Sequence, residues 1–379
     1  MNAVSSNEPI TIDILSEYRD LVKLQPEWDA LWSSVSNPGY QQSSTYTLIC
    51  WQEMHNDSRS ALRCVVVRQG GKAVLIWPLL LKKTALVKVL SPVWSTGAEY
   101  TEPLVYDGPD GPDALDLISR AWLSARSGIA ADIVSMPQVK VGSCFHTVVS
   151  KETPDIMETD TCYVAKWDQA WTDWDTYCGV IGTGHDLPQT RRRKRKLAEQ
   201  GTIEFQVLDA SCETAAMIDW SLHHKRGWAE KVNKRGSWLY SETYRNFLVA
   251  FFSTKSDLQQ VAIFLLNFNG SPIATKLVAY NKTKLDWIFT AFDATWGKYS
   301  PGSILEEYCV RWTFDRSMEL DFGVGPESYK RLWSNNNAIP TASYRFSGSM
   351  LGSIAMQAWK LRRDWRSYRK RMQARSKEN

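Results

Sequence analysis

The chain has 379 residues, of which 44% are hydrophobic and 23% are charged. This composition is typical of a folded globular protein and excludes a disordered or fibrous chain. The length predicts two domains, because single hydrophobic cores seldom grow beyond about 250 residues. The formal net charge is +4, but residues 191–196, "RRRKRK", alone supply more positive charge than that, so the basicity is local.

Several classes of protein are disfavoured at the outset. The longest apolar runs, such as residues 74–81, are far shorter than the roughly 20 residues of a membrane-spanning helix. The N-terminal segment has no basic region followed by an apolar core, so no secretory signal is predicted. Seven scattered cysteines without a CxxC pair indicate reduced thiols. We therefore expect a cytoplasmic protein without a metal site.

Two hairpins with the same pattern follow along the chain. Residues 63–81, "RCVVVRQGGKAVLIWPLLL", are two apolar runs joined by Gly-Gly, and residues 260–280, "QVAIFLLNFNGSPIATKLVAY", are joined by Asn-Gly. A third strand is expected after each hairpin, over residues 85–94 and 285–293. Segments with helical apolar spacing precede both hairpins. The sequence therefore predicts an α/β sheet flanked by helices, present twice, with two unrelated α/β units as the alternative.

A helix is predicted after the second set of strands, in residues 298–312, "KYSPGSILEEYCVRW". Ser300 suits the N-cap and Pro301 the first helical position, while Ser303 and Glu306 offer an alternative capping box. The free N–H groups and positive dipole of such a helix start can hold a phosphate. On its own the motif is equally a plain helix cap.

Residues 293–333 resemble the C-terminal signature of CelD/BcsL-type acetyltransferases of cellulose and exopolysaccharide biosynthesis, through "YSPGSILEE", "LDFGVG" and "YKRLW". These belong to the bacterial GNAT superfamily and are related to Fem-type aminoacyltransferases. The resemblance implies two tandem GNAT-like domains, each a mixed twisted sheet flanked by helices. It implies an N-terminal domain over residues 1–175, which is expected to be degenerate, and a catalytic domain over residues 201–350. Residues 176–200 would form a basic linker helix and residues 351–379 a basic amphipathic helix.

The resemblance also implies a donor and a set of site residues. A splayed strand would present its N–H groups to the acyl carbonyl, and Ser300, Gly302 and Ser303 would hold the pyrophosphate of acetyl-CoA or another acyl-CoA, without a metal. Tyr329 would be a proton donor and Lys330 would meet a substrate carboxylate or phosphate. The acceptor site would include His224, Arg226 and Trp228.

Other candidates come from the residues themselves. Asp321 ends a strand at a pair of glycines, so it is either a base or substrate clamp or a solvated acid. Trp296 is either an aromatic platform for a sugar or core filler. Glu306 and Glu307, in the first helical turn, are expected to serve structure because carboxylates favour the positive dipole.

Two basic stretches suggest partners. Residues 191–196 are either a phosphate-binding helix, for CoA, a nucleotide sugar or tRNA, or a solvated interdomain helix. In residues 351–379 an apolar stripe runs beside nine Lys or Arg. This helix could dock on its own domain, on a partner such as a polysaccharide synthase, or peripherally on the inner membrane.

The sequence thus predicts an N-acyltransferase that moves an acyl group from acyl-CoA to an amine of a sugar, amino acid or peptide by direct attack. No serine or cysteine has an evident base partner for covalent catalysis. Two alternatives stay open: a Fem-type transferase that uses aminoacyl-tRNA, and a non-catalytic component of a polysaccharide complex.

Overall fold

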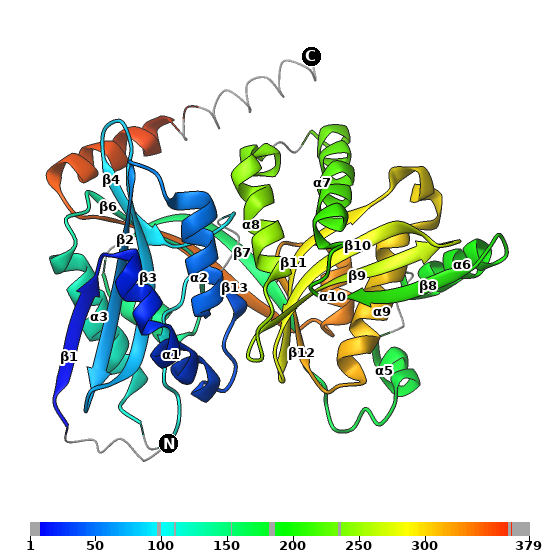
Figure 1. Ribbon diagram of the computed structural model, residues 1–379, viewed down its shortest axis with the longest axis horizontal. Helices are drawn as coiled ribbons and strands as arrows, with labels where there is room; N and C mark the ends of the chain where they lie inside the picture. Colours follow the sequence, from blue (N-terminus) through cyan, green and yellow to red (C-terminus); the bar gives the residue numbers. More distant parts are fainter. Residues whose placement is uncertain are drawn as a thin grey trace.

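The computed structural model describes residues 8–96, 100–109, 111–152, 154–181, 186–233, 236–362 and 365. These residues form two α/β halves that lie side by side (Figure 1) and share one continuous 13-stranded sheet. The strand order is β1-β2-β3-β4-β6-β13-β7-β12-β11-β10-β9-β8, with β5 paired to β3. Both halves therefore belong to a single hydrogen-bonded framework.

The first half is an α/β unit of eleven helices and strands within the described residues. In chain order these are β1 (Ile10–Leu15), α1 (Tyr18–Ser34), α2 (Ser44–Cys50), β2 (Ser60–Gln69), β3 (Lys72–Lys83), β4 (Lys88–Pro92), β5 (Leu104–Val105), α3 (Ala114–Gly128), β6 (Ile133–Lys140), α4 (Cys144–Val149) and β7 (Asp155–Ala165).

The second half repeats this order without a counterpart of β5. It consists of β8 (Ile203–Leu208), α7 (Thr214–Lys231), α8 (Glu242–Ser253), β9 (Gln260–Phe268), β10 (Ser271–Tyr280), β11 (Lys284–Phe292), α9 (Pro301–Phe314), β12 (Glu319–Val324), α10 (Ser328–Trp333) and β13 (Ala338–Ser347). Two connecting helices, α5 (Trp174–Ile181) and α6 (Asp186–Ala198), join the halves. The predicted hairpins, third strands and duplicated α/β order are confirmed.

The halves exchange their last strands. β7 follows the first half in sequence but pairs antiparallel with β12 of the second half, while β13 ends the second half and pairs antiparallel with β6 of the first. β7 and β13 also pair with each other, from Ala338 opposite Tyr163 to Arg345 opposite Asp155. A cut of the chain between the halves would therefore leave each without the strand that completes its sheet, an arrangement that the sequence patterns did not reveal.

Helices cover both faces of the sheet, because successive side chains point to opposite faces and central strands such as β3 and β9 are buried almost continuously. On one face α1 and α2 of the first half meet α7 and α8 of the second in a common core. There the Tyr46 ring lies edge-on to Phe247 and Phe251, with centroids 5.5 and 5.7 Å away. On the other face α3 and α9 each cover their own half. The shared core and the exchanged strands hold the halves in one arrangement.

The C-terminal helix expected from residue 351 is present over residues 350–362, and its predicted continuation over residues 366–379 lies outside the described residues. Within the described part of the chain, no helix is long and apolar enough to cross a membrane.

We predict that the two halves unfold together. Phe346, on β13, is buried against Trp122 of the first half, with ring centroids 4.9 Å apart. Phe346→Ala should lower the free energy of unfolding by about 3 kcal/mol by leaving a cavity. Urea unfolding followed by far-UV circular dichroism and by tryptophan fluorescence should show one transition that shifts as a whole. Two separate transitions, of which only one moves, would contradict this; exposed Ile354→Ala is the control.

Candidate active site

The candidate site of the second half lies where two parallel strands separate. β11 and β12 pair only from Lys284–Glu319 to Asp286–Asp321. Beyond that pairing β11 continues to Phe292 with a bulge at Ile288, and β12 turns away through Gly323. A bulge and a separation leave backbone groups without ladder partners. This is the splayed-strand geometry that the sequence predicted, and it opens toward the start of α9.

The start of α9 has the predicted cap with one difference. Ser300 is the N-cap and Pro301 the first helical residue, as expected. Ser300 has a left-handed backbone, with φ of 51°, and its hydroxyl does not cap the helix but accepts a hydrogen bond from Arg193 Nη1 at 2.7 Å. The alternative capping box of Ser303 and Glu306 is not formed, because the Glu306 side chain pairs elsewhere.

Basic helix α6 packs beside this helix start and supplies its charge. Arg191 pairs with Glu307 of α9 at 2.9 Å, and Lys194 lies over the Tyr308 ring at 4.1 Å. A cavity of about 600 Å³ lies between α6 and the residues that precede Ser300. Its lining has four cations and one acid, and consists of Gln189, Arg192, Arg193, Lys196, Glu199, Gln200, Lys298 and Tyr299. The cationic lining and the helix dipole both favour an anionic group such as a phosphate.

The equivalent helix start in the first half has the opposite charge. Asp113 is the N-cap of α3 and accepts a hydrogen bond from the Leu115 N–H at 3.0 Å, and Asp116 lies in the first turn. These carboxylates already occupy the position that an anion would take. A small cavity of about 20 Å³ lies beside the end of β4, and Trp77 and Tyr100 help to line it. The candidate donor site is therefore in the second half.

A buried ion pair, which was not predicted from the sequence, lies beneath α9. Lys276 on β10 and Glu306 are both almost inaccessible, with Nζ and Oε1 3.5 Å apart, and Lys276 Nζ also lies 2.9 Å from the Trp287 ring centroid. Burial raises the pKa of Glu306 to about 7, although the nearby Lys276 and Lys330 oppose this shift. Burial likewise lowers the pKa of Lys276. A lysine in the middle of the apolar strand "PIATKLVAY" was the available signal.

Tyr329 and Lys330 lie beside the strand gap on α10. The Tyr329 ring is 6.0 Å from that of Trp287, and burial raises the pKa of its hydroxyl, so the phenol keeps its proton. Lys330 is buried, donates a hydrogen bond to the Val324 carbonyl at 2.7 Å and pairs with Glu327 at 2.9 Å. Lys330 is thus engaged with this chain, whereas its predicted contact with a substrate stays a prediction.

Asp321 is a buried anchor between the halves. Its carboxylate accepts a hydrogen bond from Tyr100 at 2.7 Å and lies 3.4 Å from both Lys140 of the first half and Lys284 of the second. Burial alone would raise its pKa, but the two lysines and the Tyr100 and Gly323 hydrogen bonds lower it well below the usual value. A carboxylate that stays ionised under these conditions is a weak base. The burial of Asp321 is inconsistent with a solvated acid, and its lowered pKa makes a role as general base less favourable than a role as clamp.

The predicted acceptor residues lie across the sheet, on α7. The His224 ring lies tilted against the Trp220 ring, with centroids 4.1 Å apart. Burial lowers the pKa of His224, and Asp293, at the end of β11, opposes that effect. Arg226 donates to the Leu239 carbonyl at 2.9 Å, and Trp228 packs into the core that both halves share. His224 thus approaches the open end of β11, whereas Arg226 and Trp228 have structural contacts. Trp296 packs against Phe268 at 4.8 Å beside the α6 cavity.

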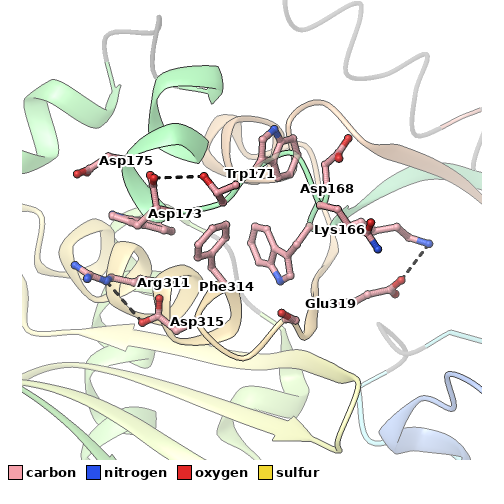
Figure 2. Close-up of a pocket in the computed structure, with 14 residues that line it drawn as sticks. Lys166, Asp168, Trp171, Asp173, Asp175, Arg311, Phe314, Asp315 and Glu319 are labelled. Carbon is pink, nitrogen blue, oxygen red and sulfur yellow. Dashed lines mark hydrogen bonds and ion pairs between the residues drawn. The ribbon is translucent and has the colours of Figure 1, made fainter.

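A larger cavity, of about 1120 Å³, lies at the opposite end of α9 (Figure 2). It is lined by aromatic side chains, including Trp171 and Phe314, and by five carboxylates against two cations. The carboxylates are Asp168, Asp173, Asp175, Asp315 and Glu319, and the cations are Lys166 and Arg311, which pair with Glu319 and Asp315. An acidic cavity at the negative end of a helix disfavours phosphate, so the α6 cavity remains the candidate anion site.

Among the described residues no group of three or more His, Cys, Asp or Glu is arranged to hold a metal ion. The sheet gap, the α9 start and the α6 cations therefore define the candidate site.

Residues 188–331 match the family model described as "Acetyltransferase (GNAT) domain". This segment begins in α6 and ends in α10, so it includes the cations, the strand gap and Tyr329. This segment of the chain is therefore similar to GNAT acetyltransferase domains. No curated protein matches the chain.

Solved structures show the same architecture at low sequence identity. FemX is 10% identical with a TM-score of 0.54 and covers 85% of this chain and 96% of its own. A conserved protein of unknown function from Bacteroides thetaiotaomicron is also 10% identical, with a TM-score of 0.53; the match covers 88% of this chain and 100% of the Bacteroides chain. A tandem GNAT protein from the clavulanic acid biosynthesis pathway is 11% identical with a TM-score of 0.47, and covers 89% and 99%. FemX and the Bacteroides protein therefore share the fold of this chain, and the predicted α/β class with a mixed sheet flanked by helices is confirmed.

We predict strong coupling between Lys276 and Glu306. Removal of either side chain leaves the other charge buried without its partner, so Lys276→Met and Glu306→Gln should each lower the free energy of unfolding by about 3 kcal/mol. The double variant should lose less free energy of unfolding than the sum of the two single losses, because it contains neither buried charge. Urea unfolding of the four proteins gives the coupling free energy, and simple additivity would show that the two side chains do not interact.

Asp321→Asn should also lower the free energy of unfolding by about 3 kcal/mol, because Lys140 and Lys284 would lose their shared carboxylate. The folded-state pKa of Asp321 is lowered, so its stabilising contribution is present above about pH 4 and is lost as the pH falls further. The difference between wild type and variant should therefore narrow in acid. Asp315→Asn, at an exposed ion pair, is the control and should change stability by under about 0.5 kcal/mol. If the stability difference between the wild type and Asp321→Asn stayed constant between pH 7 and pH 3, the proposed role of Asp321 as a charged anchor would be wrong.

Proposed function

We propose that the protein is an N-acyltransferase that takes an acyl group from acyl-CoA, acetyl-CoA in the simplest case, and transfers it to an amine of a sugar, amino acid or peptide. The observation that carries this proposal is the cationic α6 cavity at the start of α9, beside the gap between β11 and β12. The cavity fits a pyrophosphate, and Arg192, Arg193, Lys196 and Lys298 would hold it. The gap would receive the extended arm that bears the thioester.

The chemistry requires an oxyanion site, a proton acceptor and a proton donor. Backbone N–H groups of β11 near its bulge are suited to the oxyanion. Glu306, with a pKa of about 7, is suited to accept a proton near neutral pH. Tyr329 keeps its proton because burial raises its pKa, so its hydroxyl is suited to donate a hydrogen bond to the leaving thiolate. Asp321 and Lys330 would hold these groups in place through their contacts with both halves and with β12.

His224 lies on the α7 face, near enough to Asp293 at the end of β11 for that carboxylate to act on its pKa, and we propose that an acceptor amine enters between His224 and the strand gap. Trp296 packs on the α9 side of the sheet, and its contact with a substrate stays a prediction. The approach from the α7 face would bring the amine to the side of the sheet opposite α9, so that donor and acceptor meet through the gap. An amine-bearing sugar of an exopolysaccharide is one acceptor of this class.

A substitution at Gly302 tests the donor site. A Cβ on Gly302 would meet only Phe292 Cδ1, at 3.6 Å, so a side chain is accommodated. Gly302→Glu should weaken CoA and acetyl-CoA binding, measured by isothermal titration calorimetry, by about tenfold or more, because its carboxylate would compete with the phosphate for the α6 cations.

Gly302→Gln is the control, since it has the same size without the charge and should retain most of the affinity. Equal affinities for the Glu and Gln variants, with unchanged circular dichroism, would place the phosphate elsewhere. Absence of CoA binding by the wild type would reject the acyl-CoA donor.

A second candidate is aminoacyl transfer from charged tRNA. Arg192, Arg195 and Lys196 remain exposed on α6, and an exposed cationic helix can also contact a nucleic-acid backbone. Charged tRNA that binds with steep salt dependence, in a protein that does not bind CoA, would support this donor. A protein that binds neither ligand would fit the remaining alternative, a non-catalytic component of a polysaccharide complex.

A further inference from the structure

The helix over residues 350–362 docks on the first half through one of its sides. Gly352 packs so closely that an added Cβ would lie 1.8 Å from the Asp132 carbonyl oxygen. The Trp359 ring lies 4.9 Å from the Arg345 guanidinium of β13. Ser349, just before the helix, donates to Asp132 Oδ1 at 2.6 Å. The helix therefore docks on its own domain, one of the predicted possibilities, through the side that carries Gly352 and Trp359.

The apolar stripe faces solvent instead. Met350, Leu351, Ile354 and Leu361 are 81%, 48%, 58% and 71% exposed. At about 100° per residue these four positions fall within one arc of about 100°, roughly opposite Gly352 and Trp359. Such an arc of large exposed apolar side chains on one helix differs from the scattered exposure that is normal for a protein surface.

A second exposed apolar tip lies next to this helix. Leu86, in the turn between β3 and β4, is 78% exposed, and Lys83 and Lys88 beside it are exposed as well. The Lys88 N–H donates to Asp132 Oδ2 at 2.8 Å, so this turn and the start of the helix are fastened to the same carboxylate. Figure 1 shows the helix, in orange-red, beside the turn from which β4 begins. We call the exposed apolar side chains of this helix, together with Leu86 on the neighbouring turn, the C-terminal patch.

The C-terminal patch is accompanied by positive charge. Lys360 and Arg362 are exposed on the helix, and residues 351–379 contain nine Lys or Arg against two acids. Apolar side chains with a basic border match the boundary of an anionic bilayer, where the apolar groups enter the acyl region and the cations meet the headgroup phosphates.

We propose that the C-terminal patch binds the surface of anionic phospholipid bilayers, with the helix over residues 350–362 lying in the plane of the membrane. The inference is independent of the acyltransferase chemistry, because the patch is on the first half and the candidate donor site is on the second. It would hold the sheet and the active site next to a membrane-associated acceptor.

Flotation of the full-length protein with vesicles tests the proposal. Binding is expected to vesicles of 60% phosphatidylcholine and 40% phosphatidylglycerol, and at least tenfold weaker binding to pure phosphatidylcholine. The triple variant Leu351→Asn/Ile354→Asn/Leu361→Asn should weaken binding at least tenfold. Its side chains are exposed, so folding should persist, which circular dichroism verifies. Val180→Asn, at a residue of α5 that is 47% exposed in the second half, is the matched control and should bind like the wild type.

Two results would overturn the proposal: wild-type protein that stays unbound with anionic vesicles at low salt, or a triple variant that binds as tightly as the wild type. Sedimentation velocity identifies the competing occupant. A wild type that dimerises, a triple variant that is monomeric, and no vesicle binding by either would assign the patch to a second copy of the chain.

Discussion

The exchange of the last strands, β7 and β13, is the constraint on which the rest of the molecule depends. Each half offers an open sheet edge, at β6 and at β12, and each edge is covered by a strand from the other half. Unpaired edges invite association with other chains, so the exchange satisfies both edges within one molecule. It also brings β6 and β12 close enough for Lys140 and Tyr100 to reach Asp321. A buried carboxylate of the second half is thereby neutralised from the first.

Two copies of one fold have acquired different electrostatics at equivalent positions. Asp113 and Asp116 fill the start of α3, whereas the start of α9 has Ser300, Pro301 and Gly302 and faces the cations of α6. The strands β4 and β6 pair at two positions and β11 and β12 at three, so a separation of parallel strands occurs in both halves. A helix start is a generic feature of the fold, so the charges that surround it decide which of the two can receive an anion.

Much of this architecture could be predicted from local patterns. The Gly-Gly and Asn-Gly turns located both hairpins, and Ser300 with Pro301 located the start of α9, because turn and cap chemistry acts over a few residues. The strand exchange and the Tyr100–Asp321–Lys140 contacts join residues far apart in sequence, so no local pattern reports them. Lys276 gave a partial signal as a lysine in an apolar strand, but its partner could only be identified in three dimensions. Glu306 was consequently predicted only to stabilise the helix start through the dipole.

The position of α6 has an evolutionary consequence. Duplication of an ancestral unit gives two copies of every strand and helix, but a fused chain has only one segment between the copies. The basic residues lie in that segment, so they could be recruited by one helix start and not by both. Charge from a single connecting segment can therefore differ between two otherwise equivalent helix starts, so one duplicated unit can offer an anion site that the other lacks.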